Sequence, residues 1–533
     1  MHPMLRLILA TAMFFNVISG RAWPDDTPAA PGANLIQLES LKADVYFLAA
    51  PEMAGRGTAS QETLIAANYI AAEFMRLGLR PVAESSYFQN FPMIRANLDP
   101  DEMELTARWG NVRKTFQFGQ DYGYYVQSIR PSSVTAPLVF AGYGVTAPEY
   151  DYNDYEGTDV EGKVALILSY EPQMRDEKSP FKGTWNTVHA YNRQKIETAR
   201  HHGVGGLLIV REWLPTRPRP FVPSAPRPSG NRPQMALASD ILDVPTFLID
   251  RETANQLLKA SGTTIEELRK SIDQTGKPSS RDVPDVEVTM TKAFHDREVV
   301  PTRNVVGLLE GTDPELKNEV VAVTAHHDHI GTSQGRIYYG ADDNASGVAG
   351  VLEIARAFAR ADARPRRSIL FLVFEAEERG LLGAFHYAAN PVIPLEKTVA
   401  VLNMDMISRN EDSPTWDTHP EDNSNGLNLV GTLYNPELRD IIERQNALTR
   451  LDLDYKTDKE DREDWLARSD HFPFAVAGVP MVLFNTGEHP DYHTENDTWD
   501  KLNYEKMERI VRLIYLTTWE VANQNERIPF VWD

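Results

Sequence analysis

Residues 320–329 read VVAVTAHHDH, an apolar run rich in β-branched residues that ends in histidines and an aspartate. Such a run is typical of a strand that is buried on both faces, as in a parallel sheet covered by helices. Further runs of this kind occupy residues 305–309, 369–374, 399–404 and 480–484. Residues 348–358 place apolar side chains on one helix face. The sequence therefore predicts an α/β fold with a mixed, mostly parallel central sheet flanked by helices.

Five short polar motifs stand in a fixed order along the second half of the chain, and four of them follow or end an apolar run. They are His326–His329, Asp342–Gly347, Glu377–Gly380, Asn403–Met406 and Tyr492–Asp497. We expect their polar side chains to gather at one edge of the sheet. Histidines and carboxylates without any cysteine favour a hard-to-borderline metal site over a structural zinc site. The pattern predicts a metallohydrolase.

His326 and Asp328 are the first candidate pair. Alternate residues of a strand share a face, so a ligating His326 would be followed by Asp328 on the same side, with His327 and His329 pointing the other way. A carboxylate bonded to the second imidazole nitrogen would fix the ring's tautomer and orientation. A surface cluster of histidines is the alternative for this motif taken alone.

The aspartate pair Asp342 and Asp343 leads from a glycine-bounded loop into the helix at 348–358. One interpretation is a turn that caps this helix. The other is a carboxylate that bridges two metal ions. Asp405, at the end of an apolar strand, is hard to explain as a surface charge, whereas His493 is a weak signal by itself.

Glu377 and Glu378 are adjacent carboxylates at the end of a buried strand, where they would repel each other. With divalent cations present, one can bind metal while the other acts as a general base toward water. A solvated acidic turn is the alternative.

Composition restricts the partners. The net charge of −22 argues against nucleic acid and against an anionic membrane, whose phosphates would be repelled. Hydrophobic residues make up 42% of the chain, which is ample for a packed core, and its 533 residues allow roughly three domains. The oligomeric state stays open.

The first 22 residues resemble a secretory signal, with Arg6 before an apolar stretch and Gly20-Arg21-Ala22 as the cleavage site. The absence of cysteine excludes disulfides and a lipid-modified cysteine. We expect an exported protein in a bacterial periplasm or outside the cell. Seven prolines among arginines and serines at 215–233 indicate an irregular surface excursion.

Taken together, the motifs resemble those of the di-zinc aminopeptidase family, which includes the bacterial leucyl and Streptomyces-type aminopeptidases. The glutamate carboxypeptidase and transferrin receptor branch belongs to the same superfamily. Residues 48–82 resemble the first segment of the bacterial members, and residues 136–285 resemble their inserted, mainly β, protease-associated domain. The implied division is a signal at 1–22, peptidase segments at 23–135 and 286–533, and the insertion between them.

The resemblance also implies the site. His326 and Asp405 would bind one zinc ion, Glu378 and His493 would bind a second, and Asp343 would bridge the two through a cis peptide to Asn344. Asp328 would orient His326. Glu377 would be the general base toward a water that bridges the metals. Manganese or cobalt could replace zinc.

The resemblance implies an exported aminopeptidase that acts on peptide N-termini. A glutamate-releasing carboxypeptidase on the same fold is an alternative, and it would need a cationic pocket. The sequence assigns no arginine to such a pocket, although Arg379 and Arg409 lie near the motifs. A one-zinc glutaminyl cyclase and a non-catalytic receptor-like binding protein are further alternatives, against which the full ligand set counts.

Overall fold

The computed structural model describes residues 30–83, 85–125, 129–174, 176–211, 233–239, 244–411, 423–459 and 465–532. The expected signal at residues 1–22 and residues 215–232 of the proline-rich excursion lie outside these ranges. In the described part of the chain, no helix combines the length and the apolar character needed to cross a bilayer.

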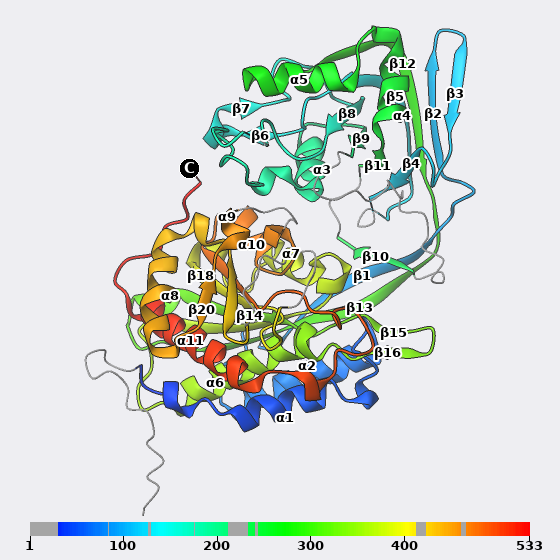
Figure 1. Ribbon diagram of the computed structural model, residues 1–533. Coiled ribbons are helices and arrows are strands. Elements are labelled where there is room, and N and C mark those ends of the chain that lie inside the picture. The colour runs from blue at the N-terminus through cyan, green and yellow to red at the C-terminus, as the bar shows by residue number, and fades with distance from the viewer. Residues whose placement is uncertain are drawn as a thin grey trace, which may run out of the picture.

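A nine-stranded sheet forms the larger body of the molecule (Figure 1). Its strands in spatial order are β10 (Gln234–Leu237), β1 (Phe88–Leu98), β13 (Phe294–Leu309), β17 (Ser368–Phe374), β14 (Val320–His326), β18 (Thr398–Met404), β21 (Met481–Asn485), β19 (Gly426–Val430) and β20 (Asp452–Asp454). The central strands β17, β14, β18 and β21 run parallel, and antiparallel strands adjoin them on both sides. All five apolar runs predicted as strands lie in this sheet.

Helices cover both faces of this sheet, which explains why its central strands are apolar throughout. Val321 and Val323 belong to the core shared with α1, α2, α6, α8 and α11, whereas Val320 and Ala322 belong to the core shared with α7 and α10. The helices are α1 (Leu38–Leu48), α2 (Gln61–Arg76), α6 (Gly347–Arg360), α7 (Leu382–Ala389), α8 (Pro436–Thr449), α9 (Lys456–Lys459), α10 (Phe472–Val476) and α11 (Tyr504–Asn523). The expected α/β architecture is confirmed.

A second sheet of eight strands forms a separate body above the first (Figure 1). Its order is β3 (Val112–Phe116), β2 (Glu104–Trp109), β12 (Arg281–Lys292), β5 (Ser132–Phe140), β8 (Val164–Leu168), β9 (Gly206–Val210), β11 (Thr246–Ile249) and β4 (Tyr122–Tyr124). The helices α3 (Asn192–His201), α4 (Arg251–Leu258) and α5 (Ile265–Thr275) accompany it. This body includes β2–β4, which precede residue 136.

Two short hairpins complete the list of strands: β6 (Thr146–Ala147) with β7 (Tyr152–Asn153), and β15 (Gly331–Ser333) with β16 (Arg336–Tyr338). The second hairpin begins just after the first polar motif. It therefore lies next to the edge of the main sheet where the motifs gather.

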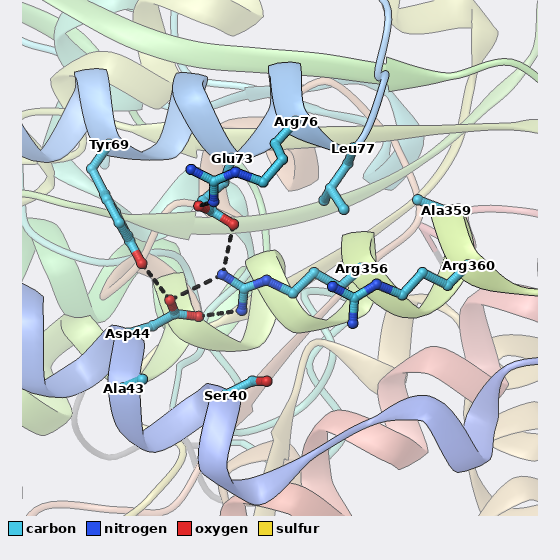
Figure 2. A pocket seen from close by; sticks show the side chains of 10 residues that line it. All are labelled: Ser40, Ala43, Asp44, Tyr69, Glu73, Arg76, Leu77, Arg356, Ala359 and Arg360. Atoms are coloured by element: carbon cyan, nitrogen blue, oxygen red, sulfur yellow. Dashed lines mark hydrogen bonds and ion pairs between the residues drawn. The ribbon is translucent and has the colours of Figure 1, made fainter.

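A cavity of about 540 Å³ lies between α1, α2 and α6, and an ion-pair cluster lines it (Figure 2). Arg356 of α6 lies 2.5 Å from Asp44 of α1 and 3.0 Å from Glu73 of α2, and Tyr69 donates its hydroxyl to Asp44 at 2.6 Å. None of the residues that line this cavity belongs to the five polar motifs. The cluster ties three helices together beneath the sheet.

Candidate metal centre

The parallel strands bring the motifs together. In the register of the sheet, His326 pairs with Phe374 of β17, and Thr324 pairs with Asn403 of β18. The residues that follow these partners along β17 and β18 therefore reach the edge at which β14 ends. The candidate side chains come from the end of β14, the turn before α6, the turn after β17, the residue after β18 and the loop after β21, in the order His326, Asp343, Glu378, Asp405 and His493.

Two groups of potential ligands meet at this edge and share Asp343. One group contains His326, Asp343 and Asp405, and the other contains Asp343, Glu378 and His493 together with His329; within each group the ligand atoms lie within 4.8 Å of one another. Asp343 Oδ1 is 3.5 Å from His326 Nε2, and its Oδ2 is 3.0 Å from His493 Nε2. Each oxygen of this carboxylate thus faces a different group. The structure brings together all five side chains expected as ligands.

His329 corrects one expectation. Strand alternation predicts that it points away from His326, yet its Nδ1 lies 2.7 Å from Glu378 Oε1. The reason is that β14 ends at His326, so alternation no longer applies three residues later. The sequence placed His329 in a polar motif but gave the wrong direction for its side chain.

Asp328 contacts two parts of the centre. The backbone carbonyl of Asp328 lies 3.1 Å from His326 Nδ1, whereas its carboxylate Oδ1 is 3.7 Å from that nitrogen. The same Oδ1 accepts the backbone N–H of Glu377 at 3.1 Å. The Glu377 carboxylate reaches to 3.9 Å from His326 Nε2. Asp328 therefore positions the turn that carries Glu377 as well as the His326 ring.

The turn that carries Asp343 is held from several sides. The expected cis peptide between Asp343 and Asn344 is present. Asn344 donates from Nδ2 to the carbonyl of Met404 at 2.9 Å, and the carboxylate of Asp497 accepts the backbone N–H groups of Asp342 and Asp343. Asp342 itself belongs to neither ligand group. Asp497 stands in the fifth motif, but the sequence assigned it no role.

Two further residues were missed because their partners are distant in sequence. Arg56 is fully buried and donates from Nε to the carbonyl of His327 at 2.9 Å and from Nη2 to that of Gly340 at 2.7 Å. Thr58 donates its hydroxyl to Asp328 Oδ2 at 2.6 Å. Both residues lie within residues 48–82, and the resemblance of that segment assigned neither of them a role. Both residues support the backbone that carries the ligands.

Burial and the crowding of charge shift the pKa values of the acidic side chains in the centre. Burial raises the pKa of Glu377 well above its usual range, and the carboxylates of Asp405 and Glu378 raise it further. Burial also favours the neutral form of Glu378, but the rings of His329 and His493 outweigh that effect and hold its pKa well below its usual range. The centre concentrates negative charge, which protons or cations must balance.

The donor set fits metal ions. Glu378 Oε1 and both ring nitrogens of His329 are buried and have no hydrogen-bond partner among the described residues. Buried polar atoms without partners are costly, and imidazole nitrogens and carboxylate oxygens are zinc ligands. Bound cations would satisfy these atoms and neutralise the carboxylates.

A narrow cavity opens beside Asp405. The side chains of Trp465, Arg468, Glu488 and Tyr492 contribute to its lining. The guanidinium of Arg468 lies 2.8 Å from the Glu488 carboxylate and 4.8 Å from the centre of the Trp465 ring. Tyr492 stacks on His493 at 3.8 Å. The cavity therefore combines aromatic surface with a paired cation and an acid.

An α/β sheet with a buried histidine and carboxylate cluster at the end of its parallel strands defines a metallohydrolase. Residues 304–518 match the profile of Peptidase family M28. This part of the chain belongs to that peptidase family, and the expected family and the expected metallo-exopeptidase are confirmed. The family, with the zinc metalloproteases among its relatives, implies a zinc cofactor.

Relatives are similar over much of the chain. The aminopeptidase YwaD of Bacillus subtilis is 23% identical over 74% of this chain and 68% of its own length. A probable lipoprotein aminopeptidase, LpqL of Mycobacterium tuberculosis, is 30% identical over 70% of this chain and 64% of its own. A glutamate carboxypeptidase 2 homolog of Caenorhabditis briggsae is 25% identical over 67% of this chain and 50% of its own length. Among solved structures, an aminopeptidase from Aneurinibacillus sp. strain AM-1 has a TM-score of 0.47 at 22% identity, over 93% of this chain and 97% of that one.

Proposed function

We propose that this chain is an exported aminopeptidase that uses two zinc ions to release the N-terminal residue of peptides. The observation that carries this proposal is the pair of ligand groups that share Asp343, with Glu377 beside them. A single carboxylate shared between two groups of potential ligands is suited to two adjacent cations.

One zinc ion would be held by His326, Asp343 and Asp405, and the other by Asp343, Glu378 and His493. Manganese or cobalt would fit the same nitrogen and oxygen donors. When bound, the ions would lower the pKa of water and polarise the carbonyl of the scissile peptide bond.

Glu377 would move the proton. Its carboxylate would take a proton from the attacking water and then deliver it to the nitrogen of the leaving peptide, as a general base and then a general acid. Asp328 would hold Glu377 in place through its hydrogen bond from the Glu377 backbone N–H.

The lining of the cavity beside Asp405 counts against a pocket for a C-terminal carboxylate. Among the described residues that line the cavity, Arg468 is the cation, and it is already paired with Glu488 at 2.8 Å. Arg409 is likewise paired, with Asp491 at 2.9 Å. A carboxypeptidase would need a cation available for the C-terminal carboxylate of its substrate, so this lining supports the aminopeptidase.

Paired substrates test the proposal. The zinc-loaded protein is incubated with a peptide that has a free N-terminus and with its N-acetylated twin, both ending in glutamate. We expect release of the first residue from the free peptide alone, and two zinc ions per chain by elemental analysis. Release of the C-terminal glutamate from both peptides would show the carboxypeptidase instead. A single zinc ion would favour the cyclase, and absence of both zinc and turnover would favour the receptor-like protein.

We also propose that the second sheet forms the inserted protease-associated domain, and that residues 1–22 direct export. The resemblance of residues 136–285 and the composition of the N-terminus support these two assignments. N-terminal sequencing of the protein from a periplasmic fraction tests the second. A mature chain that begins near residue 23 is expected, and a chain that still begins at Met1 would contradict export.

A further inference from the structure

His329 is a buried histidine of the metal centre that the five expected ligands leave out. Its side chain has no exposed surface, and its backbone N–H donates to the carbonyl of Arg56 at 2.9 Å. The backbone is therefore fixed where the ring enters the centre.

The position of the ring relative to Glu378 indicates what it does. Nδ1 of His329 lies 2.7 Å from Glu378 Oε1, yet neither atom has a hydrogen-bond partner among the described residues. In the metal-free centre this short approach pairs the ring with the carboxylate. It also brings a nitrogen and an oxygen, both of them zinc-ligand atoms, to the same side of the centre.

Two other ligand atoms converge on the same place. His493 Nε2 lies 3.6 Å from Glu378 Oε1 and 3.0 Å from Asp343 Oδ2, and that same Oδ2 lies 3.6 Å from His329 Nδ1. Two nitrogens and two carboxylate oxygens thus surround one point from separate parts of the chain. Four such donors form the usual set of a tetrahedral zinc site.

The backbone beside His329 leaves room for this ring. A Cβ atom on Gly340 would lie 2.5 Å from Cγ and Cδ2 of His329, so any other residue there would displace the imidazole. Gly340 also has a φ of 60°, which favours glycine. The tight packing of this ring is what a fixed ligand requires.

We propose that His329 is a fourth protein ligand of the zinc ion that Asp343, Glu378 and His493 hold, an inference that rests on the proposed two-zinc function. The two sites then differ. The His329 site would have four protein ligands, whereas the site of His326, Asp343 and Asp405 would have three, the number that leaves an open position for water or substrate in a catalytic zinc site.

The open site lies on the side of Glu377. The Glu377 carboxylate is 3.9 Å from His326 Nε2, and Asp405 of the same site lines the narrow cavity. His329 would therefore strengthen the binding of one ion, while the other site lies nearer to Glu377 and the cavity.

Two variants of the same shape test the inference. Asp and Asn both place an oxygen near the position of Nδ1, but only the carboxylate of His329→Asp is a good zinc ligand, whereas the amide of His329→Asn can donate a hydrogen bond to Glu378. Metal-free protein is titrated with zinc against a chelating indicator, and the two binding steps are fitted separately. A thermal melt of each metal-free variant checks that it folds.

Direct ligation predicts that one of the two steps weakens by more than about 100-fold in His329→Asn, beyond the roughly 10- to 100-fold loss typical of a residue that only supports a ligand. The same step in His329→Asp should stay at least about tenfold tighter than in the asparagine variant. His493→Ala should weaken the same step, and His326→Ala the other one.

The adjacent His327 supplies the matched control. It is equally buried but belongs to neither ligand group. His327→Asn should leave both zinc-binding steps unchanged. Two intact steps in His329→Asn, or tighter binding in the asparagine variant than in the aspartate variant, would overturn ligation by His329. A wild-type chain that binds one zinc ion would contradict the proposed two-zinc function instead.

Discussion

Arg56 donates from Nη2 to the carbonyl oxygen of Gly340 at 2.7 Å and so joins two segments 284 residues apart in the sequence. The same guanidinium donates to the carbonyl of His327 at 2.9 Å and to that of Tyr339 at 3.0 Å. These carbonyls belong to the loop that follows His326 and to the turn that precedes Asp343. One buried side chain therefore fixes the backbone of two ligand-bearing segments relative to each other.

Replacing Arg56 should loosen the metal centre. Arg56→Gln leaves backbone carbonyls without partners, and we expect it to lower zinc affinity by roughly 10- to 100-fold, as loss of an outer-shell partner does. Stability should also fall by about 1–3 kcal/mol for the unsatisfied buried groups. Chelator competition measures the first effect, and urea unfolding of the metal-free protein measures the second.

Arg367 is the matched control for Arg56. It is 1% exposed, pairs through Nε with Glu319 at 2.8 Å and donates to the carbonyls of Val521, Gln524, Asn525 and Glu526 at the end of α11, with no metal ligand among these partners. Arg367→Gln should lower stability by at least as much as Arg56→Gln and leave zinc affinity intact. Equal losses of zinc affinity in both variants would show that Arg56 acts only through general stability.

Glu377 should matter for turnover and not for metal binding. In Glu377→Gln we expect kcat to fall by roughly 10²- to 10⁴-fold, the usual contribution of a general base, while the zinc content stays at the wild-type level. Steady-state kinetics and elemental analysis measure the two quantities. Glu375→Gln is the control, because this buried carboxylate accepts the backbone N–H of Ala59 at 2.8 Å and belongs to neither ligand group. Turnover of Glu377→Gln equal to that of this control would rule out the proton-transfer role.

The convergence of the ligands could be predicted from the sequence because strand periodicity carries it. Apolar runs that end in His326 and just before Asp405 become neighbouring parallel strands, and neighbouring parallel strands end at the same edge. The turn at Asp343 could be placed because the helix that follows it has a clear apolar face. In these cases the local sequence pattern predicts the element, and the pairing of parallel strands brings the ends of the elements together.

His329 and Arg56 could not be placed in this way. Alternation of side chains holds only within a strand, and His329 lies beyond the last residue of β14. Arg56 acts on backbone carbonyls, which every residue possesses, so no side-chain pattern marks its partners. The boundaries of the second sheet were hard to predict for a related reason, since β2 and β12 pair across more than a hundred residues.

Zinc should stabilise the fold measurably. A ligand that binds the folded chain but not the unfolded chain stabilises the fold by RT ln(1 + [L]/Kd). This is about 2.7 kcal/mol when free zinc is one hundred times its Kd. Crowded carboxylates at the centre make the metal-free form the less stable one. Differential scanning calorimetry should show a Tm that rises with the logarithm of free zinc and falls back after chelation. A Tm independent of zinc would contradict the assignment of the two ligand groups to metal.

The ion-pair cluster of Figure 2 should contribute to stability without affecting catalysis. Asp44 accepts from both terminal nitrogens of Arg356, at 2.5 and 3.0 Å, and its removal leaves that buried guanidinium undercompensated. We expect Asp44→Ala to lower the free energy of unfolding by about 3 kcal/mol. This is the lower end for breaking a buried ion pair, because Glu73 still contacts Arg356.

Arg76 provides the comparison for Asp44. It pairs with the same Glu73, but its side chain is 70% exposed. Arg76→Ala should change stability by no more than about 1 kcal/mol, since exposed ion pairs contribute little. Urea unfolding of both variants measures the difference, and kcat should be unchanged in both. Equal costs for the two substitutions would contradict the buried character of the Asp44–Arg356 pair.

Glu171 in the second body should make stability depend on pH. It is fully buried, accepts the N–H and the hydroxyl of Thr187 at 2.9 and 2.5 Å, and burial raises its pKa from 4.5 to about 8. Between these two values the folded chain keeps a proton that the unfolded chain has released. The stabilisation from neutral Glu171 is therefore complete below pH 4.5 and is lost as pH rises through about 8.

Glu171→Gln removes this titration, because the amide stays neutral and retains an oxygen that accepts from Thr187. We expect the stability of the wild type minus that of the variant to fall by a few kcal/mol between about pH 4.5 and 8 and to level off above that range. Lys195, whose pKa burial lowers to about 7, titrates in both proteins, so the subtraction reduces its contribution. Urea unfolding at a series of pH values measures the difference. A difference that does not change with pH would mean that Glu171 is ionised in the folded chain.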